Sequence, residues 1–383
     1  MKKPMKIVIA PDSFKECLGA AEVAGIIADE LRALAPAENC IAGVRQPFRE
    51  ILECPLSDGG EGFTEILSRH WKAEKVPVVV TGPLGGPVRT WYGKAGETAI
   101  VDAASVCGLS LVPVPLRNPL HTTTKGLGEI LLAAYRDGCR KAIVGLGGSA
   151  TCDGGMGLME AEGPLAPGAS ALPVRALAGK MEIRVLCDVT NPFVGPQGAA
   201  RVFGPQKGAD AATVEVLEER LERMAARIRR ETGKDIRTVP GSGAAGGLAG
   251  ALMAWFDAEL LPGIDSMLTF TGFRKMIEDA DVIVTGEGKS DSQTLSGKVP
   301  FGVLQAARLS GRPVPVLLFS GIVEDREALL QAGFSRVVQI TPPSLPHDRA
   351  IQPDVASRHL RQAVARVDFG ACVTPFLSVG QPK

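Results

Sequence analysis

The sequence has no excess of charge of either sign, because lysine plus arginine and aspartate plus glutamate number 42 each among its 383 residues. A chain without net charge does not attract nucleic acid or an anionic membrane through its overall field, so any anion must be bound by local groups. No apolar run approaches the length of a membrane span. The N-terminal MKKPMKIVIA also lacks the long apolar segment and cleavage site of a secretory signal. These absences predict a cytoplasmic protein with no nucleic-acid or membrane partner.

Two common classes of motif are missing as well. None of the eight cysteines forms a C-x-x-C pair, which argues against a zinc site or thiol redox chemistry and is typical of a reducing compartment. No G-x-x-x-x-G-K-[ST] motif occurs, so the chain is not a P-loop kinase. Aromatic residues make up only 5% of the chain, but 45% of it is hydrophobic, which is enough for the cores of two domains at this length.

The chain has instead a series of glycine-rich breaks after short apolar runs, and residues 142–157 (AIVGLGGSATCDGGMG) form the central one. The run AIVGL predicts a buried parallel strand. The glycines then leave the backbone bare, so that its N–H groups can surround an anion. The alternative is a tight strand-to-helix turn that binds nothing. The residues expected to hold phosphate here are Gly147, Gly148, Ser149, Thr151 and Gly154.

Polar residues follow other predicted strands in the same way. A strand over 6–10 leads into Asp12, Ser13 and Lys15, and a strand over 51–56 leads into Asp58 and Glu61. In an open α/β sheet, ligands bind beyond the carboxyl ends of the strands. Paired carboxylates among glycines suit a magnesium ion or an oriented base. The alternatives are a solvated turn for the first group and a helix capping box for the second.

Two later strands add similar groups. A strand over 280–286 is followed by a loop with Glu287, Lys289 and Asp291, and a strand over 183–187 is followed by Asp188 and Asn191. An aspartate directly after a buried strand is either a turn former or a catalytic base, and its position at the sheet edge favours the base.

Two loops of the middle region carry weaker signals. Lys207 stands between a proline and a glycine, where its ammonium group could be aimed at phosphate oxygens, although an exposed turn lysine is the commoner alternative. Residues 241–246 match G-x-G-x-x-G, but the segments around them are poor strands, which disfavours a dinucleotide site. We interpret these glycines as a helix N-terminus that faces an anion or as positions of close packing.

Several blocks, in order along nearly the whole chain, resemble the bacterial type I glycerate kinase family. They are APDSFK (10–15), PLSDGGEG (55–62), GGSAT-x-DGG (147–155), CDVTNP (187–192), FGPQKGA (203–209), G-x-GAAGG (241–247) and GEGK-x-D-x-QT-x-x-GK (286–298). The resemblance implies an α/β fold of two domains with the active site in the cleft between them. One is Rossmann-like and built from both chain ends, residues 1–75 and 276–383, and the other is an inserted mixed α/β domain, residues 76–275.

The resemblance also implies ATP-dependent phosphorylation of D-glycerate to 2-phosphoglycerate. Phosphoryl transfer depends mainly on positioning, magnesium and charge neutralisation, which suits the glycines, carboxylates and lysines of these loops. Our hypothesis is that Asp188 or Asp153 accepts the substrate hydroxyl proton, while Lys15 and Lys207 neutralise the transferring group. The expected Mg²⁺ ligands are Asp58, Glu61, Glu287 and Asp291; the further ATP contacts are Gly243, Gly286 and Gly288; the glycerate contacts are Asp12, Ser13, Asn191 and Lys289.

Several alternatives remain open. The product is 3-phosphoglycerate in some members of the family, and a related hydroxy acid such as hydroxypyruvate or tartronate fits the same residues. A nucleotide-dependent dehydrogenase would use residues 241–246 for pyrophosphate, and a non-catalytic phosphate or sugar-acid sensor would need the glycine loops without the carboxylates. The oligomeric state, including a homo-oligomer, is also open.

Overall fold

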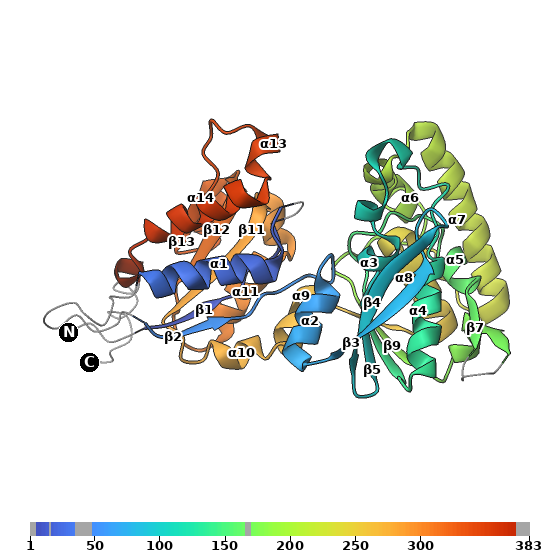
Figure 1. Ribbon diagram of the computed structural model, residues 1–383. Coiled ribbons are helices and arrows are strands. Elements are labelled where there is room, and N and C mark those ends of the chain that lie inside the picture. The colour runs from blue at the N-terminus through green and yellow to red at the C-terminus, as the bar shows by residue number, and fades with distance from the viewer. Residues whose placement is uncertain (1–4, 15–16, 35–47, 165–169, 373–383) are drawn as a thin grey trace, which may run out of the picture. The chain divides into compact units, whose positions relative to one another are not determined.

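Figure 1 shows the computed structural model of the chain, which describes residues 5–14, 17–34, 48–164 and 170–372. The chain divides into two compact units, one of Met1–Ser57 with Met267–Lys383 and the other of Asp58–Ser266. Both boundaries lie earlier than residues 75 and 275, where the sequence analysis places them. The first difference has a simple cause, because helix α2 (Phe63–Trp71) packs on strands β4 (Pro87–Ala95) and β5 (Thr98–Asp102) of the second unit.

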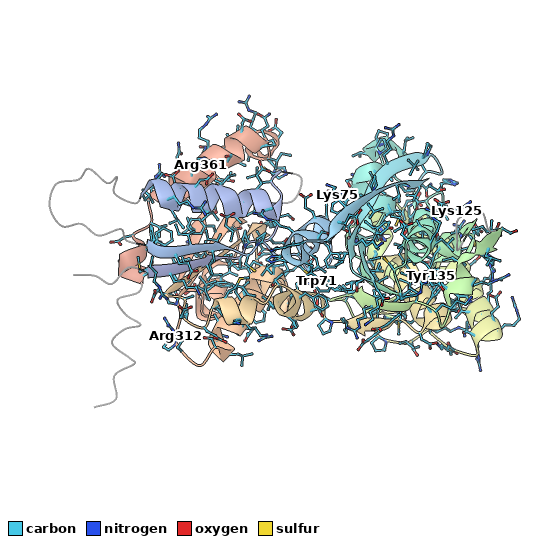
Figure 2. The ribbon with its side chains drawn as sticks, turned by 60° about the horizontal axis from the view of Figure 1, so that its bottom comes forward. Trp71, Lys75, Lys125, Tyr135, Arg312 and Arg361 are labelled. Atoms are coloured by element: carbon cyan, nitrogen blue, oxygen red, sulfur yellow. The ribbon has the colours of Figure 1, made fainter. Side chains whose placement is uncertain are left out.

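The first unit contains a five-stranded parallel sheet in the order β13-β12-β11-β1-β2. Its central strands are apolar because helices cover a parallel sheet on both faces. Helices α1 and α14 pack together on one core, and Nη1 of Arg361, labelled in Figure 2, lies 3.9 Å from Oε2 of Glu30. The strands are β1 (Met5–Ile9), β2 (Phe48–Glu53), β11 (Val282–Ser290), β12 (Val316–Val323) and β13 (Arg336–Gln339). The helices are α1 (Ala20–Ala33), α10 (Phe273–Met276), α11 (Val299–Leu309), α12 (Arg326–Gln331), α13 (His347–Ala350) and α14 (Pro353–Ala365), with the 3₁₀ turn η6 (Ser292–Ser296).

Helix α1 shows how closely apolar spacing predicts burial. Val23, Ile27 and Leu31, which lie on one helical face, are fully buried in the core of this unit. Leu34, which follows Leu31 by three residues, is 41% exposed, because the helix ends at Ala33 and Leu34 is only its C-terminal cap.

The second unit contains a mixed six-stranded sheet in the order β10-β9-β6-β5-β4-β3. Strands β3 and β4 form an antiparallel hairpin, and β4 also pairs antiparallel with β5. Strands β5, β6, β9 and β10 are parallel to one another. The predicted fold class, with a parallel-sheet domain from both chain ends and an inserted mixed α/β domain, is therefore confirmed. The strands not yet given are β3 (Glu74–Thr81), β6 (Lys141–Gly145), β9 (Glu182–Leu186) and β10 (Glu259–Leu261), and a separate hairpin joins β7 (Glu162–Pro164) to β8 (Ala171–Pro173).

The helices of the second unit cover the sheet and enclose a second core. In this core α7 (Ala211–Thr232) packs its buried face against Phe193 and the neighbouring apolar residues. The other helices are α3 (Ala104–Cys107), α4 (Lys125–Arg136), α5 (Met156–Met159), α6 (Ala199–Phe203) and α8 (Leu248–Phe256), with 3₁₀ turns η1 (Leu109–Leu111), η2 (Val114–Leu116), η3 (Val174–Leu177), η4 (Pro205–Lys207) and η5 (Ala244–Gly247); α9 (Gly263–Phe270) crosses the boundary between the units. Within the described ranges, no helix is both long and apolar enough to cross a membrane.

Candidate active site

The central loop, residues 147–155, follows strand β6 and is held in place by backbone hydrogen bonds to three other segments. The N–H groups of Gly147, Ala150 and Gly154 donate to the carbonyl oxygens of Gly59 (3.0 Å), Cys107 (2.8 Å) and Gly246 (3.0 Å). These N–H groups are therefore not available to a ligand.

The N–H groups of Gly148 and Ser149 remain available in the same loop. Neither has a hydrogen-bond partner among the described residues, and Gly148 is exposed, with a left-handed φ of +77° that suits glycine. Two successive free N–H groups at the carboxyl end of a parallel strand suit an anion. Of the residues predicted to hold phosphate, Gly147 and Gly154 thus have their N–H groups engaged. Thr151 keeps an N–H group and a buried hydroxyl without a partner among the described residues, as Gly148 and Ser149 keep their N–H groups.

Glycines bring the segment 58–62 into direct backbone contact with the end of strand β6. A Cβ atom on Gly145 would lie 2.4 Å from the Gly59 oxygen, and one on Gly147 would lie 2.5 Å from Cα of Gly60. Real side chains do not fit at such distances, so the two segments can approach this closely only because Gly145 and Gly147 have no side chain. The capping box that we considered for residues 57–61 is wrong, because α2 starts at Phe63 after Gly62 and has no side-chain cap.

Asp188 follows strand β9 and has the clearest electrostatic signature of a base. The N–H of Gly263 donates to its Oδ1 atom at 2.7 Å, and the Ile264 N–H also bonds the carboxylate. Asp188 is an exposed residue. Partial burial of its carboxylate, together with the charge of Asp58, nevertheless raises the pKa of Asp188 to about 6, and the two amide hydrogen bonds oppose this shift. A carboxyl group with this pKa is a base near neutral pH that protonates readily during turnover.

Asp153 is buried and holds the central loop against helix α4. Its carboxylate accepts hydrogen bonds from the N–H groups of Thr124 (2.9 Å), Gly155 (3.0 Å) and Gly157 (3.1 Å) and from the Thr124 hydroxyl (2.9 Å). Both carboxylate oxygens are therefore engaged by the protein. Thr124, which the sequence analysis does not single out, completes this arrangement by accepting the N–H of Leu158 at 2.8 Å.

We expect Asp153→Asn to lower the free energy of unfolding by about 3 kcal/mol, because an asparagine NH₂ would face backbone N–H groups in a buried site. Urea unfolding measures this loss. Asp210→Asn is the matched control, since Asp210 caps α7 in an exposed position by accepting the Thr213 N–H, where asparagine is an equally good cap. Equal stability of the two variants would contradict the structural role of Asp153.

Lys207 is buried, contrary to the alternative of an exposed turn lysine. The residue is 4% exposed, and its Nζ atom donates to Oγ of Ser149 at 3.1 Å and to the Thr151 oxygen at 2.6 Å. Burial lowers the pKa of Lys207, and the charge of nearby Asp153 opposes this shift. The ammonium group therefore contacts the central loop from inside the protein.

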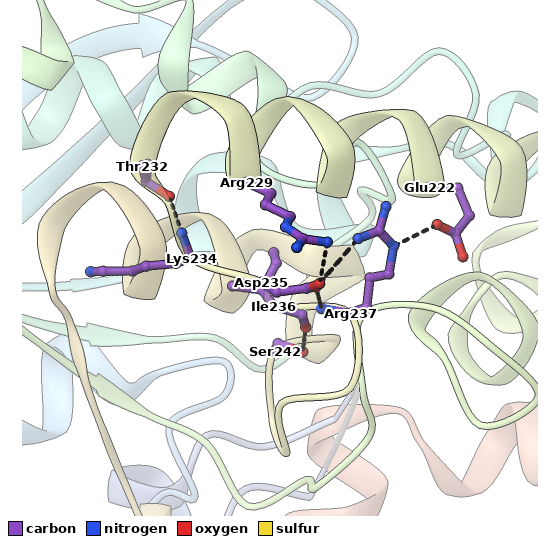
Figure 3. A network of polar contacts seen from close by, with 8 residues as sticks. All are labelled: Glu222, Arg229, Thr232, Lys234, Asp235, Ile236, Arg237 and Ser242. Carbon is purple, nitrogen blue, oxygen red and sulfur yellow. Dashed lines mark hydrogen bonds and ion pairs between the residues drawn. The ribbon is translucent and has the colours of Figure 1, made fainter.

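Residues 241–247 use their glycines for packing. A Cβ atom on Gly243 would lie 2.1 Å from the Pro192 oxygen, and one on Gly246 would lie 2.1 Å from the Thr151 oxygen. A polar network connects this loop to the residues before it, since Ser242 Oγ donates to the Ile236 oxygen (Figure 3). No strand occurs over residues 233–243, all of which the structure describes. A dinucleotide fingerprint requires that strand, which disfavours the dinucleotide site, and the two distances show that Gly243 and Gly246 are positions of close packing.

In the first unit, Glu287 lies in a strand and Asp291 follows directly after that strand. The prediction of a loop there is wrong over residues 287–290, since β11 continues to Ser290 and Glu287 pairs with Ser320 of β12. Glu287 Oε1 accepts hydrogen bonds from the hydroxyls of Ser290 (2.9 Å) and Thr294 (2.6 Å). Burial raises the pKa of Glu287, and the Thr294 hydroxyl and Lys298 oppose the shift.

Two lysines neutralise this acidic group. Nζ of Lys298, which the sequence analysis does not select, lies 3.6 Å from Glu287 Oε2 and 3.8 Å from Asp291 Oδ1. Nζ of Lys289, a residue expected to contact substrate, lies 3.9 Å from Asp291 Oδ2 and 3.0 Å from Glu324 Oε1. Lys298 follows Gly297 at the start of α11 and belongs to the GK end of the last family block, which is the signal that could have selected it.

The remaining predicted residues are distributed over both units. Asp12 is buried beside β11 and accepts the Ser13 N–H at 2.7 Å. Gly286 is also a close-packing glycine, since a Cβ atom there would lie 2.5 Å from the Phe319 oxygen, and Gly288 lies inside β11. Asn191 donates from Nδ2 to the Gln197 oxygen at 2.8 Å. Lys15 lies outside the described residues.

The four predicted metal ligands do not belong to one unit. Asp58 and the exposed Glu61 lie in the second unit, whereas Glu287 and Asp291 lie in the first. Among the residues that the structure describes, no group of three or more histidine, cysteine, aspartate or glutamate side chains could hold a metal ion.

Comparison with known proteins identifies the family of this chain. A model of the glycerate kinase family matches residues 7–169 and 170–369. Glycerate kinase of Bacillus subtilis (strain 168) is 40% identical over 369 residues, which is 91% of this chain and 93% of that protein. Glycerate 2-kinase of Escherichia coli (strain K12) is 38% identical over 88% of this chain and 90% of its own length. A crystal structure from Salmonella typhimurium LT2, provisionally named glycerate kinase 2, is 36% identical with a TM-score of 0.74 and covers 99% of this chain and 100% of its own.

Proposed function

Because the chain belongs to the glycerate kinase family, we propose that it transfers the γ-phosphoryl group of ATP to the 2-hydroxyl group of D-glycerate, with 2-phosphoglycerate and ADP as products. The observation that carries this proposal is the Asp188 carboxylate, a base with a pKa of about 6 at the carboxyl edge of a sheet. The central loop, which follows the neighbouring strand β6 of the same sheet, offers two successive free N–H groups. The 2-phosphate product is supported by the E. coli relative, whose name is glycerate 2-kinase.

Asp188 is the proposed proton acceptor in this reaction. The Gly263 and Ile264 N–H groups orient its carboxylate, which takes the proton of the substrate hydroxyl as that oxygen attacks the γ-phosphorus and the bond from phosphorus to the ADP oxygen breaks. Of the two aspartates that the sequence suggests, Asp153 is the weaker candidate, since its oxygens already accept four hydrogen bonds.

The central loop is the proposed phosphate cradle. Its support is the pair of free N–H groups at Gly148 and Ser149, because backbone donors fixed in position stabilise developing negative charge without reorganising. Asn191 lies in the loop after Asp188, and we retain it as a glycerate contact. In the first unit, Asp12, Ser13 and Lys289 remain proposed contacts of the substrate.

Magnesium is proposed to bind through Asp58 and Glu61. The donor set fits a hard cation, because carboxylate oxygens are its preferred ligands. The charge of Asp58 also raises the pKa of Asp188, so negative charge gathers here that a cation would offset. Glu287 and Asp291 fit less well, since Lys298 and Lys289 already lie beside them. When bound, the metal would neutralise charge on the transferring phosphate.

The test is a coupled assay of ADP release with ATP, magnesium and D-glycerate, followed by phosphorus NMR of the product. We expect turnover and a 2-phospho signal. A 3-phospho signal would keep the kinase and overturn the proposed position of transfer. Turnover with hydroxypyruvate or tartronate but not with D-glycerate would overturn the proposed substrate. ATP binding without turnover on any of these acids would favour a sensor over an enzyme.

A further inference from the structure

We propose that Lys207 acts on the reaction through Ser149, by fixing the Ser149 hydroxyl as a hydrogen-bond donor to a phosphate oxygen. This inference rests on the proposed function and adds a positioning residue to it. It replaces direct contact of Lys207 with the transferring phosphoryl group, which the sequence analysis suggests.

The position of Lys207 is set by a rigid turn. The residue ends η4, and Gly208 follows with a left-handed φ of +98°. A Cβ atom on Gly208 would lie 2.2 Å from the Arg117 oxygen, so the turn is packed tightly against residue 117. The side chain is held inside by its bonds to Ser149 Oγ and the Thr151 oxygen. A buried ammonium group held in this way does not reach a ligand on the outer side of the loop.

Hydrogen-bond chemistry then determines the direction of the Ser149 hydroxyl. An ammonium group only donates, so Ser149 Oγ must accept from Lys207, and its own proton points elsewhere. Among the described residues this proton has no acceptor. A hydroxyl that accepts a charge-assisted bond becomes a stronger donor.

The hydroxyl belongs to one of two successive loop residues whose backbone N–H groups are free. Ser149 carries one of these N–H groups, and Gly148 carries the other. Three donors within two successive residues suit an oxyanion that has several acceptor sites, such as a phosphate group. The ligand class is therefore the phosphate chain of the nucleotide or the group in transfer.

The thiols around Lys207 offer it no competing partner of opposite charge. Burial raises the pKa of Cys107 to about 12 and that of Cys152 to about 11, so both thiols stay neutral near pH 7. Asp153 is the nearby anion that contributes to the field at Lys207, and its oxygens are bonded to backbone N–H groups and to Thr124. The direct bonds of the lysine are thus directed to the central loop.

A double-mutant cycle tests the inference. Ser149→Ala and Lys207→Met should each lower kcat/KM for ATP on the order of 10- to 100-fold, because each removes the same oriented donor. The double variant should lose little more than Lys207→Met alone, since the two residues act as a unit. Direct contact of Lys207 with phosphate predicts instead that the two losses multiply. Multiplied losses would overturn the inference.

The matched control pairs Lys207→Met with Ser242→Ala. Ser242 is a buried serine of the same unit that donates to the Ile236 and Val239 oxygens. Its removal should lower the free energy of unfolding. Any loss of kcat/KM that it causes should multiply with the loss in Lys207→Met. If Ser242→Ala were coupled to Lys207→Met as strongly as Ser149→Ala is, the coupling would reflect general destabilisation, and the inference would be overturned.

Two further outcomes keep the test decisive. If Lys207→Met does not fold, Lys207→Arg replaces it in the cycle, and Ser149→Ala alone decides the hydroxyl role: wild-type kcat/KM in that variant overturns the inference. If the wild-type protein itself does not phosphorylate D-glycerate, the proposed function fails, and the inference fails with it.

Discussion

Replacement of Asp188 by asparagine should lower kcat by about three orders of magnitude, which is the size of effect that general bases contribute. Asparagine keeps the shape of the side chain and can still accept the Gly263 N–H, but it cannot take a proton. The KM for D-glycerate should change little, because the loss concerns the transition state and not the binding of substrate. Steady-state assays of ADP release measure both parameters.

Asp257→Asn is the control for this prediction. Asp257 is exposed, pairs with Lys234 on the surface and adopts a left-handed φ of +54° that asparagine also tolerates. We expect it to keep wild-type kcat. Near-normal turnover of Asp188→Asn with intact substrate binding would remove Asp188 as the base.

Gly246→Ala should be the second most damaging change. The new methyl group would lie 2.1 Å from the Thr151 oxygen and 2.5 Å from Cα of Cys152, at a φ of +67° that alanine rarely adopts. Backbone strain and overpacking together should lower the free energy of unfolding by about 3 kcal/mol. Because the Thr151 oxygen accepts from Lys207, its displacement should also lower kcat about 100-fold.

Gly272→Ala separates the two causes. Gly272 has the same φ of +67°, but nothing lies within 4 Å of an added Cβ atom. Its cost should be about 1 kcal/mol, from backbone strain alone, with kcat unchanged. Urea unfolding of both variants gives the comparison. If Gly246→Ala were no less stable and no less active than Gly272→Ala, the close approach of the two loops would not matter for function.

Strand ends and polar loops were predictable because their signals are local. The apolar run before Gly147 and the one before Asp188 are short, and both became central parallel strands of the second unit. Parallel strands align their carboxyl ends, so Ser149 and Asp188, which follow the paired strands β6 and β9, belong to one edge without any knowledge of contacts. The family blocks strengthened the same residues.

Roles that depend on tertiary partners were not predictable in this way. Two of the four hydrogen bonds to Asp153 come from Thr124, which lies 29 residues away in the sequence. Lys207 and its two acceptors are more than fifty residues apart in sequence. A glycine needed for a left-handed turn and one needed for close approach also look alike in a sequence, so the packing role of Gly243 required the fold.

The pH dependence of kcat/KM for D-glycerate, at saturating MgATP between about pH 5 and pH 8, tests the central role of Asp188 most directly. The base works when it has lost its proton, so activity should fall as pH falls through about 6, and about tenfold per unit below that. Partial burial, the larger cause of the raised pKa, persists when a cation neutralises Asp58. The residual activity of Asp188→Asn should not show this fall. A wild-type profile that stays flat from pH 8 to pH 5 would contradict the assignment.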